Sequence, residues 1–237
     1  MGDNILDYCE LETDLGIKVN GTLNWTQHSN SVYSRANQRF AILRRTCSFI
    51  NNLKMKRVLY LTMVRSLFEH CPTVWRPSSM TAILHLESLQ KRAFKWIFGE
   101  SPACYSEDNT LYFIHCKQLN ILPIRFRFDL HDLVSFHSMV YEFSCVKLPP
   151  YLHKFEGTRL RSSHLDSMCY VSTITPRSNN NSFSNSYFYR THLAWNRLPP
   201  NLRIILNQND FRAKVTDYLW KEVGHSIRSG IHYDFDV

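Results

Sequence analysis

The chain has 237 residues, of which 44% are hydrophobic and 14% aromatic, so it can bury a core and does not have the composition of a disordered chain. No stretch approaches the roughly 20 apolar residues of a membrane-spanning helix. The acidic N-terminus also lacks the basic start and apolar middle of a signal peptide. We therefore expect an intracellular protein, in the cytoplasm or nucleus, with no membrane partner.

The net charge of +8 is unevenly distributed along the chain. Residues 1–25 hold one basic and five acidic side chains, whereas residues 26–100 hold twelve basic and three acidic ones, net +9. Residues 101–160 are balanced, and residues 161–237 hold nine basic and six acidic side chains. Such a concentrated basic segment is what a surface that binds a polyanion requires.

The first predicted elements are a β-hairpin and an amphipathic helix. The stretch "LGIKVNGTLNW" predicts two short strands joined by a turn at Asn20 and Gly21. From Val32 to Ile50, apolar residues then recur at steps of three and four, which predicts a helix over residues 29–50.

Two further helices complete a bundle. The same periodicity predicts a second helix over residues 54–71, ended by Pro72. A third helix is expected after a cap at Ser78 or Ser79. It should run to Phe98, because Gly99 suits the position just past a helix end.

The rest of the chain predicts helices separated by long loops. Helices are expected over residues 111–119, 124–142 and 210–222, the last capped by Asp210. Residues 101–110 read as a polar loop, and residues 156–182, with the Asn/Ser-rich stretch "TPRSNNNSFSNS", lack apolar periodicity. The predicted fold class is therefore mainly α. It comprises a short N-terminal β-hairpin (residues 1–28), a three-helix bundle (29–100) and a helical C-terminal region with long loops (101–237).

The strongest candidate for catalysis is the run Glu69, His70 and Cys71 at the predicted end of the second helix. A cysteine nucleophile needs its base within hydrogen-bonding distance, which neighbours on one helix do not provide. A packed helix end is the favoured alternative, in which Arg65 four residues earlier pairs with Glu69.

No other motif indicates an active site or a cofactor. The seven cysteines are odd in number and never spaced as CxxC, so we expect reduced structural thiols and no metal site. There is no glycine-rich phosphate loop, no GxSxG and no HExxH. We expect no catalytic residue and no cofactor.

The basic residues of the three predicted helices are the main candidates for function. Phosphates are their natural partners, and such contacts give affinity without choice of sequence. The alternative is an ordinary solvated helix surface. The candidate nucleic-acid-binding residues are Arg35, Arg39, Arg44, Arg45, Lys56, Arg57, Lys91, Arg92 and Lys95.

Several stretches together resemble the C-terminal part of non-LTR retrotransposon reverse transcriptases of the jockey and CR1 kind. They are "DLGIKVNGTLNWTQHSNSVYSRANQRFAILRRT", "LYLTMVRSLFEHCPTVWRP", "LESLQKRAFKWI", "RLRSS", "FSNSYFYRTHLAWNRLPPNLR" and "FRAKV". They occur in the family's order and spacing, over most of residues 12–220. No single one of them would be specific.

The resemblance implies the end of a polymerase palm followed by a thumb. Leu15 and Gly16 match the hairpin near the family's primer grip, and residues 29–98 match the thumb, which holds the template–primer duplex. Glu69 and Trp75 match the family's residues at the end of the second helix. His70 stands where tyrosine is usual, and Ser66 where proline is usual.

The family's catalytic Asp-Asp motif lies upstream of the hairpin, and no Asp-Asp pair occurs in this chain. The sequence therefore predicts a truncated reverse transcriptase without polymerase activity, which binds an RNA–DNA or other duplex weakly and without sequence preference. It is also expected to self-associate or to pair with the missing palm. The alternatives are a helical protein-interaction module, a functionless relic of a retroelement, or a Cys-His hydrolase.

Overall fold

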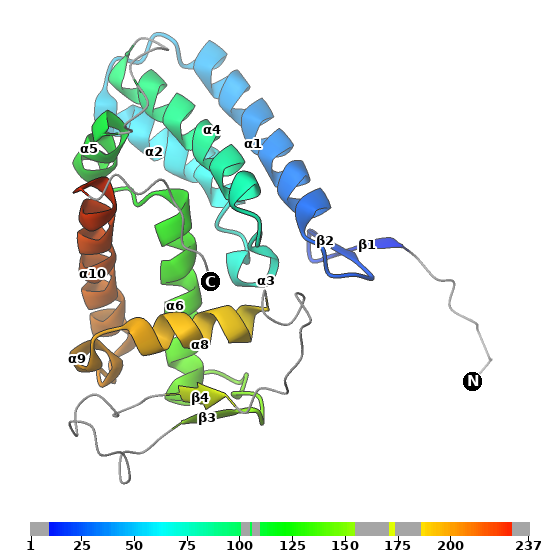
Figure 1. Cartoon of the computed structure of the whole chain (residues 1–237). Helices are drawn as coiled ribbons and strands as arrows, with labels where there is room; N and C mark the ends of the chain where they lie inside the picture. The colour runs from blue at the N-terminus through cyan, green and yellow to red at the C-terminus, as the bar shows by residue number, and fades with distance from the viewer. Residues whose placement is uncertain (1–9, 101–104, 106–109, 155–170, 174–185, 229–237) are drawn as a thin grey trace. The chain divides into compact units, whose positions relative to one another are not determined.

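The computed structural model describes residues 10–100, 105, 110–154, 171–173 and 186–228. It confirms a mainly helical protein with an N-terminal two-stranded antiparallel hairpin (Figure 1). The chain divides into two compact units, Met1–Phe98 (unit 1) and Gly99–Val237 (unit 2). No helix in the described part of the chain is both long and apolar enough to cross a membrane.

The hairpin turns earlier in the chain than the sequence predicts. Strand β1 (Leu11–Asp14) pairs with β2 (Ile17–Asn20), so the two-residue turn is Leu15-Gly16. Both turn residues have positive φ, +46° and +83°, as the tight turns of right-twisted hairpins require. Asn20 instead forms a second turn that leads into the first helix, where its side chain accepts a hydrogen bond from the backbone N–H of Asn24 (2.8 Å).

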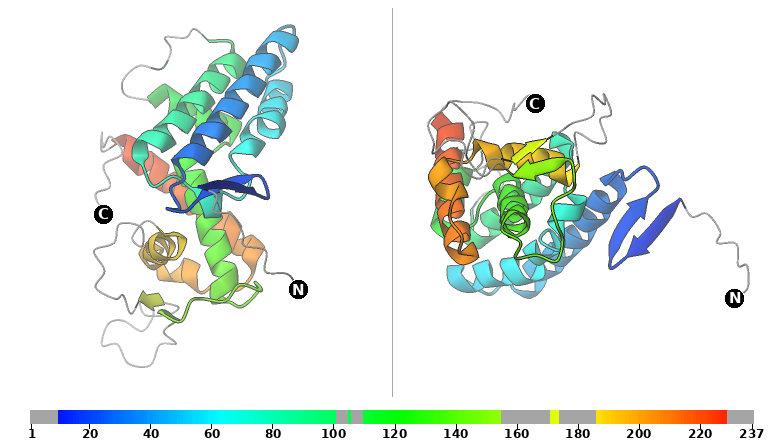
Figure 2. Two further views of the ribbon diagram at one scale, coloured as in Figure 1. Left: turned by 90° about the vertical axis from the view of Figure 1, so that its right-hand side faces the viewer. Right: turned by 90° about the horizontal axis from the view of Figure 1, so that it is seen from below.

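Three long helices form the body of unit 1 and lie side by side (Figure 2): α1 (Thr26–Thr46), α2 (Leu53–Met63) and α4 (Met80–Phe98). Between α2 and α4 lie the 3₁₀ turn η1 (Arg65–Leu67) and the short helix α3 (Pro72–Trp75). The predicted end of the third helix is confirmed, because Gly99 follows it with φ +73°.

The second predicted helix is much shorter than expected. It ends at Met63, and Pro72 begins α3 where it was predicted to end α2. Proline is well suited to a first helical turn, since the N–H that it lacks has no partner there. Cys71 precedes it with φ +47°, a left-handed conformation that reverses the chain. The first helix also differs, because it ends at Thr46 and not at residue 50.

The core of unit 1 is built from one stripe of each helix and closed by Trp75. The predicted apolar positions Val32, Ala36, Phe40 and Leu43 of α1 are buried. Trp75 is fully buried, and its indole N–H donates to the carbonyl of His70 (2.7 Å). The other fully buried large side chains of this unit are Phe68, Tyr60, Phe94, Leu43, Leu86 and Leu89.

Unit 2 is organised around α6 (Ile124–Val140), against which α8 (Tyr187–Arg197) and α10 (Gln208–Arg228) pack. It also contains α5 (Thr110–Leu119), α9 (Pro200–Arg203) and the strand pair β3 (Leu152–Lys154) and β4 (Val171–Thr173). Trp195 is fully buried, and its ring centre lies 5.6 Å from that of Phe211.

Several elements of unit 2 differ from the prediction. Helices α8 and α9 and both strands were not expected, and β4 falls within the predicted loop 156–182. Asn196 of α8 explains β4, because its amide exchanges two hydrogen bonds with the backbone of Val171 (3.0 and 2.7 Å). Asn207, and not Asp210, caps α10 by accepting from two backbone N–H groups. Almost all of the stretch "TPRSNNNSFSNS" and most of residues 101–110 lie outside the described residues.

Truncating Trp75 to Ala should destabilise unit 1 by about 3–5 kcal/mol, because it leaves a large cavity and the carbonyl of His70 without its donor. Denaturant unfolding followed by far-UV circular dichroism measures the change. Phe49→Ala is the control, since Phe49 is 78% exposed and its truncation should cost less than about 0.5 kcal/mol. Equal effects of the two variants would contradict the role of Trp75 in the core.

Candidate nucleic-acid interface

The surface of the unit 1 bundle carries exposed cations, whereas its two carboxylates are buried or paired. Between residues 26 and 98, all of which the structure describes, the only acidic residues are Glu69 and Glu87. Glu87 is 3% exposed, and the half-buried Glu69, whose side chain is 25% exposed, pairs with Arg65 at 2.9 Å. In the described part of unit 1, exposed acidic side chains therefore lie on or directly before β1, where Glu12 and Asp14 are two of them.

The expected partnership of Glu69 with Arg65 is thus present, and it is part of a larger buried network. Arg65 is 3% exposed, and a terminal nitrogen of its guanidinium donates to Gln90 Oε1 of α4 (2.9 Å). The hydroxyl of Tyr60 donates to the same oxygen (3.0 Å). The network joins α2, η1 and α4. Arg65 and Glu69 therefore stabilise the packing of these elements and are not candidates for binding a ligand.

Arg35 and Arg39 lie on one border of the buried stripe of α1. Both are exposed and four residues apart, which places them on the same side of the helix. Arg39 extends toward the end of α2, where its guanidinium lies 3.5 Å from the carbonyl oxygen of Met63. A cation at a helix C-terminus is electrostatically favourable. These two arginines therefore form a paired positive group on the α2 side of α1.

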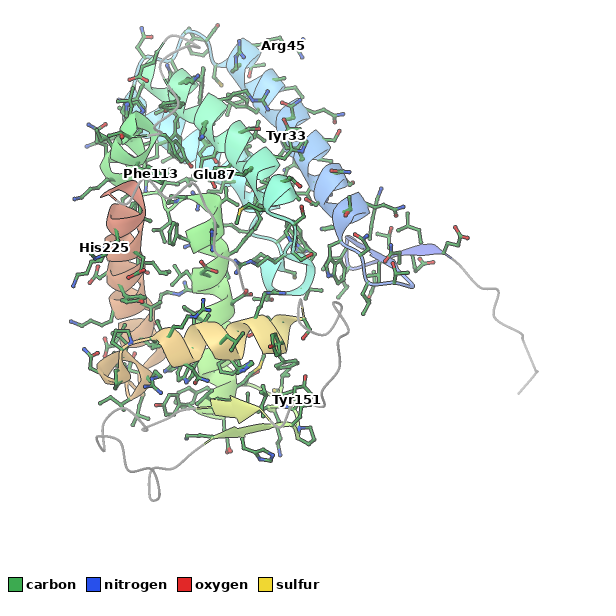
Figure 3. All side chains as sticks on the ribbon, viewed as in Figure 1. Tyr33, Arg45, Glu87, Phe113, Tyr151 and His225 are labelled. Atoms are coloured by element: carbon green, nitrogen blue, oxygen red, sulfur yellow. The ribbon has the colours of Figure 1, made fainter. Side chains whose placement is uncertain are left out.

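Arg44 and Arg45 are exposed but do not continue that group. Nine residues at about 100° each place Arg44 about 180° around α1 from Arg35, on the side of Tyr33, which contacts α4. Arg45 lies at the end of α1 remote from the hairpin (Figure 3). The structure therefore does not gather all the predicted arginines of α1 on one side.

Lys56 requires a correction, because it is buried and not on the surface. Its side chain is 9% exposed, and its ammonium group donates to the carbonyl oxygen of Trp96 (3.0 Å) and lies 5.2 Å from the centre of the Trp96 ring. Trp96 is in the last turn of α4, where unpaired carbonyls and the helix dipole favour a cation. Lys56 holds α2 to α4, a role that helical spacing alone does not reveal.

The remaining candidates are distributed around α4 and α2. Arg92 is exposed and donates to the hydroxyl of Tyr33 on α1 (3.0 Å). Lys91 and Lys95 are half-buried and share another side of α4, about 60–100° around the helix from Arg92. Arg57 of α2 is half-buried as well.

Leu15 and Gly16, the predicted primer-grip-like residues, lie at the tip of the hairpin. Leu15 is 85% exposed, and its carbonyl oxygen lies 3.1 Å from His70 Nε2, within hydrogen-bonding distance. On β2, the backbone N–H of Lys18 donates to His28 Nδ1 (3.1 Å). Two histidines of the bundle thus fix the hairpin. Neither contact was predicted, because the partners of these histidines are backbone atoms of the hairpin.

The run Glu69, His70 and Cys71 does not form a catalytic arrangement. Glu69 is paired with Arg65, His70 is bonded to the hairpin, and Cys71 is an exposed free thiol at a backbone reversal. Among the described residues no group of three His, Cys, Asp or Glu side chains could hold a metal ion. The other described cysteines are also free thiols: Cys47, Cys116 and Cys145. The remaining three cysteines lie outside the described residues: Cys9, Cys104 and Cys169.

Comparisons of the chain with models of protein families, with curated proteins and with solved structures gave no match.

The attachment of the hairpin should depend on pH through His28. Burial, together with the nearby charges of Arg35, His70 and Lys18, lowers the pKa of His28 from 6.5 to about 4. The neutral ring is therefore favoured in the folded state. Its contribution to stability is complete above pH 6.5 and is lost as the pH falls toward 4.

Between pH 7 and 4.5 the folded protein should lose up to about 2 kcal/mol of stability through this group. Urea unfolding at several pH values measures it, in the wild type and in His28→Gln, which keeps an acceptor for Lys18 but does not titrate. The variant should show a shallower fall with pH. Parallel curves would contradict the assignment to His28.

Proposed function

We propose that unit 1 binds double-stranded nucleic acid, an RNA–DNA hybrid among them, by contacts between its arginines and the phosphate backbone. The observation that supports this proposal is the state of the two carboxylates between residues 26 and 98: Glu87 is buried, and the half-buried Glu69 is paired with Arg65. Arg35 and Arg39, by contrast, are exposed on one border of α1. When cations have no neighbouring carboxylates, a duplex can bind to them without breaking ion pairs within the protein. Release of counterions is then the main source of affinity, and it does not depend on the sequence of the duplex.

The proposal agrees with the resemblance to the thumb of non-LTR reverse transcriptases. Three helices of residues 26–98 with a short hairpin before them suit a thumb and the end of a palm. A hybrid duplex is near A-form, and its wide, shallow minor groove can be approached by a helix such as α1. We propose that Arg35 and Arg39 contact one run of phosphates there.

We further propose that the chain is not itself a polymerase. Phosphoryl transfer by that family needs closely placed carboxylates that hold two metal ions. The sequence contains no Asp-Asp pair, and in the described part of the chain the hairpin that carries the exposed acids of β1 pairs with no further strand. In this proposal the chain binds nucleic acid but does not extend a primer.

A second candidate function is interaction with another protein through α2. Met55 and Val58 lie on its outer side and are 53% and 52% exposed, and Phe49 in the preceding turn is 78% exposed. An exposed apolar group of this kind is typical of a contact surface. Self-association through these side chains would require no role for the arginines.

The salt dependence of duplex affinity tests the proposed function. The double variant Arg35→Gln/Arg39→Gln should weaken binding of a hybrid duplex and reduce the slope of log affinity against log salt by up to about two units, one for each phosphate that is no longer neutralised. Fluorescence anisotropy with a labelled duplex of about 20 base pairs, between about 50 and 300 mM salt, measures both quantities.

The control is Lys117→Gln/Lys147→Gln, which removes the same charge from two exposed lysines of unit 2. This variant should keep the wild-type slope. If both double variants changed the slope equally, the charge of α1 would have no special role, and protein interaction through α2 would become the better explanation.

A further inference from the structure

An aromatic pair, a half-buried tyrosine and an exposed histidine, lies at the seam between α1 and α4. The rings of Tyr33 and His85 are stacked with centres 3.6 Å apart and planes inclined by 26°. Tyr33 comes from α1 and faces α4 (Figure 3), whereas His85 comes from α4 and is exposed. One face of the imidazole is covered by Tyr33, and the residue as a whole remains exposed to solvent.

Arg92 completes this group two turns further along α4. Seven residues bring it back to nearly the same side of the helix as His85. One of its terminal nitrogens donates to the Tyr33 hydroxyl (3.0 Å), which holds the guanidinium beside the edge of the stacked rings. Helix α1 contains no acidic residue, so the opposing helix offers no carboxylate to neutralise Arg92.

We propose that Tyr33, His85 and Arg92, the seam cluster, bind an unpaired nucleotide, with its base stacked on His85 and its phosphate held by Arg92. This inference rests on the proposed binding of nucleic acid and adds a preference for a duplex that carries a single-stranded end. An aromatic platform beside a cation is the common arrangement for single strands, because every base has a face that can stack.

An unpaired nucleotide suits the seam cluster better than a base pair does. Inside a duplex both faces of each base are covered by its neighbours, whereas a base in an overhang can present one face to an imidazole ring. Tyr33 and Arg35 lie on opposite borders of the same turn of α1, within about the 10–12 Å diameter of a helix. Because the two sides of α1 differ by about 160°, an overhang joined to a duplex held at Arg35 and Arg39 must cross the width of this helix to reach the seam cluster.

The alternative is that the stacked rings only join α1 to α4. Phe40 and Trp96 also bring rings of α1 and α4 together further along the same seam, but edge to face, with ring centres 6.1 Å apart and planes inclined by 80°. A purely structural pair would affect unfolding when it is removed but would not distinguish one nucleic acid from another. The test therefore compares two ligands on the same protein.

The full chain is titrated with a blunt hybrid duplex and with the same duplex extended by a few unpaired nucleotides, on the 5′ or the 3′ end in separate arms. The wild type should bind one extended duplex about five-fold or more tightly than the blunt one. A 2-aminopurine in that overhang should lose fluorescence on binding, as it does when it stacks.

His85→Ala should abolish both the preference and the quenching, while blunt-duplex affinity stays within about two-fold of wild type. Arg92→Gln should reduce the preference more than Arg45→Gln, its control, which removes the same charge from an exposed arginine outside the seam cluster. Equal affinity of the wild type for blunt and extended duplexes, or a preference that survives His85→Ala, would overturn the inference alone. No binding of any duplex would overturn the proposed function as well.

Discussion

The bundle of unit 1 depends on a buried arginine. Arg65 donates hydrogen bonds to Glu69, four residues later, and to Gln90 on α4. Gln90 also accepts a hydrogen bond from the hydroxyl of Tyr60 on α2. A buried guanidinium is tolerated only when its charge is paired and its donors are satisfied, so these elements must meet at one place. Removing one partner of such a group costs about 3–5 kcal/mol, because a charge is left uncompensated in the interior.

The charged side chains that are engaged inside the bundle determine the net charge of its surface. Both carboxylates of residues 26–98 are engaged within the fold, whereas only Lys56 and Arg65 among its twelve basic residues are buried. In unit 2 an acid is also withdrawn from the surface, since Asp132 is 2% exposed and pairs with Arg190 at 3.0 Å. That ion pair joins α6 to α8. Because it contains one positive and one negative charge, it does not leave a positive excess on the surface of unit 2 like the one that marks unit 1.

Periodicity predicted the helices better than the turns and the long-range contacts. The stripe Val32, Ala36 and Phe40 located α1, because burial repeats every three to four residues. The pattern placed the hairpin turn at Asn20-Gly21, but Leu15 adopts the unfavourable positive φ while His70 holds its carbonyl from 55 residues away. Lys56 was likewise beyond reach, since its partner on α4 is 40 residues distant along the chain. The same holds for the stacking of His85 on Tyr33, which joins two different helices.

The central claim is that duplex nucleic acid lies against the arginines of α1. The most direct measurement is the rate at which phenylglyoxal modifies each arginine with and without a saturating hybrid duplex, read by mass spectrometry of the digested chain. Arg35 and Arg39 should be protected by the duplex, whereas Arg197 and Arg212, which are exposed in unit 2, should react at an unchanged rate. Equal protection of all four, or protection confined to Arg197 and Arg212, would contradict the account.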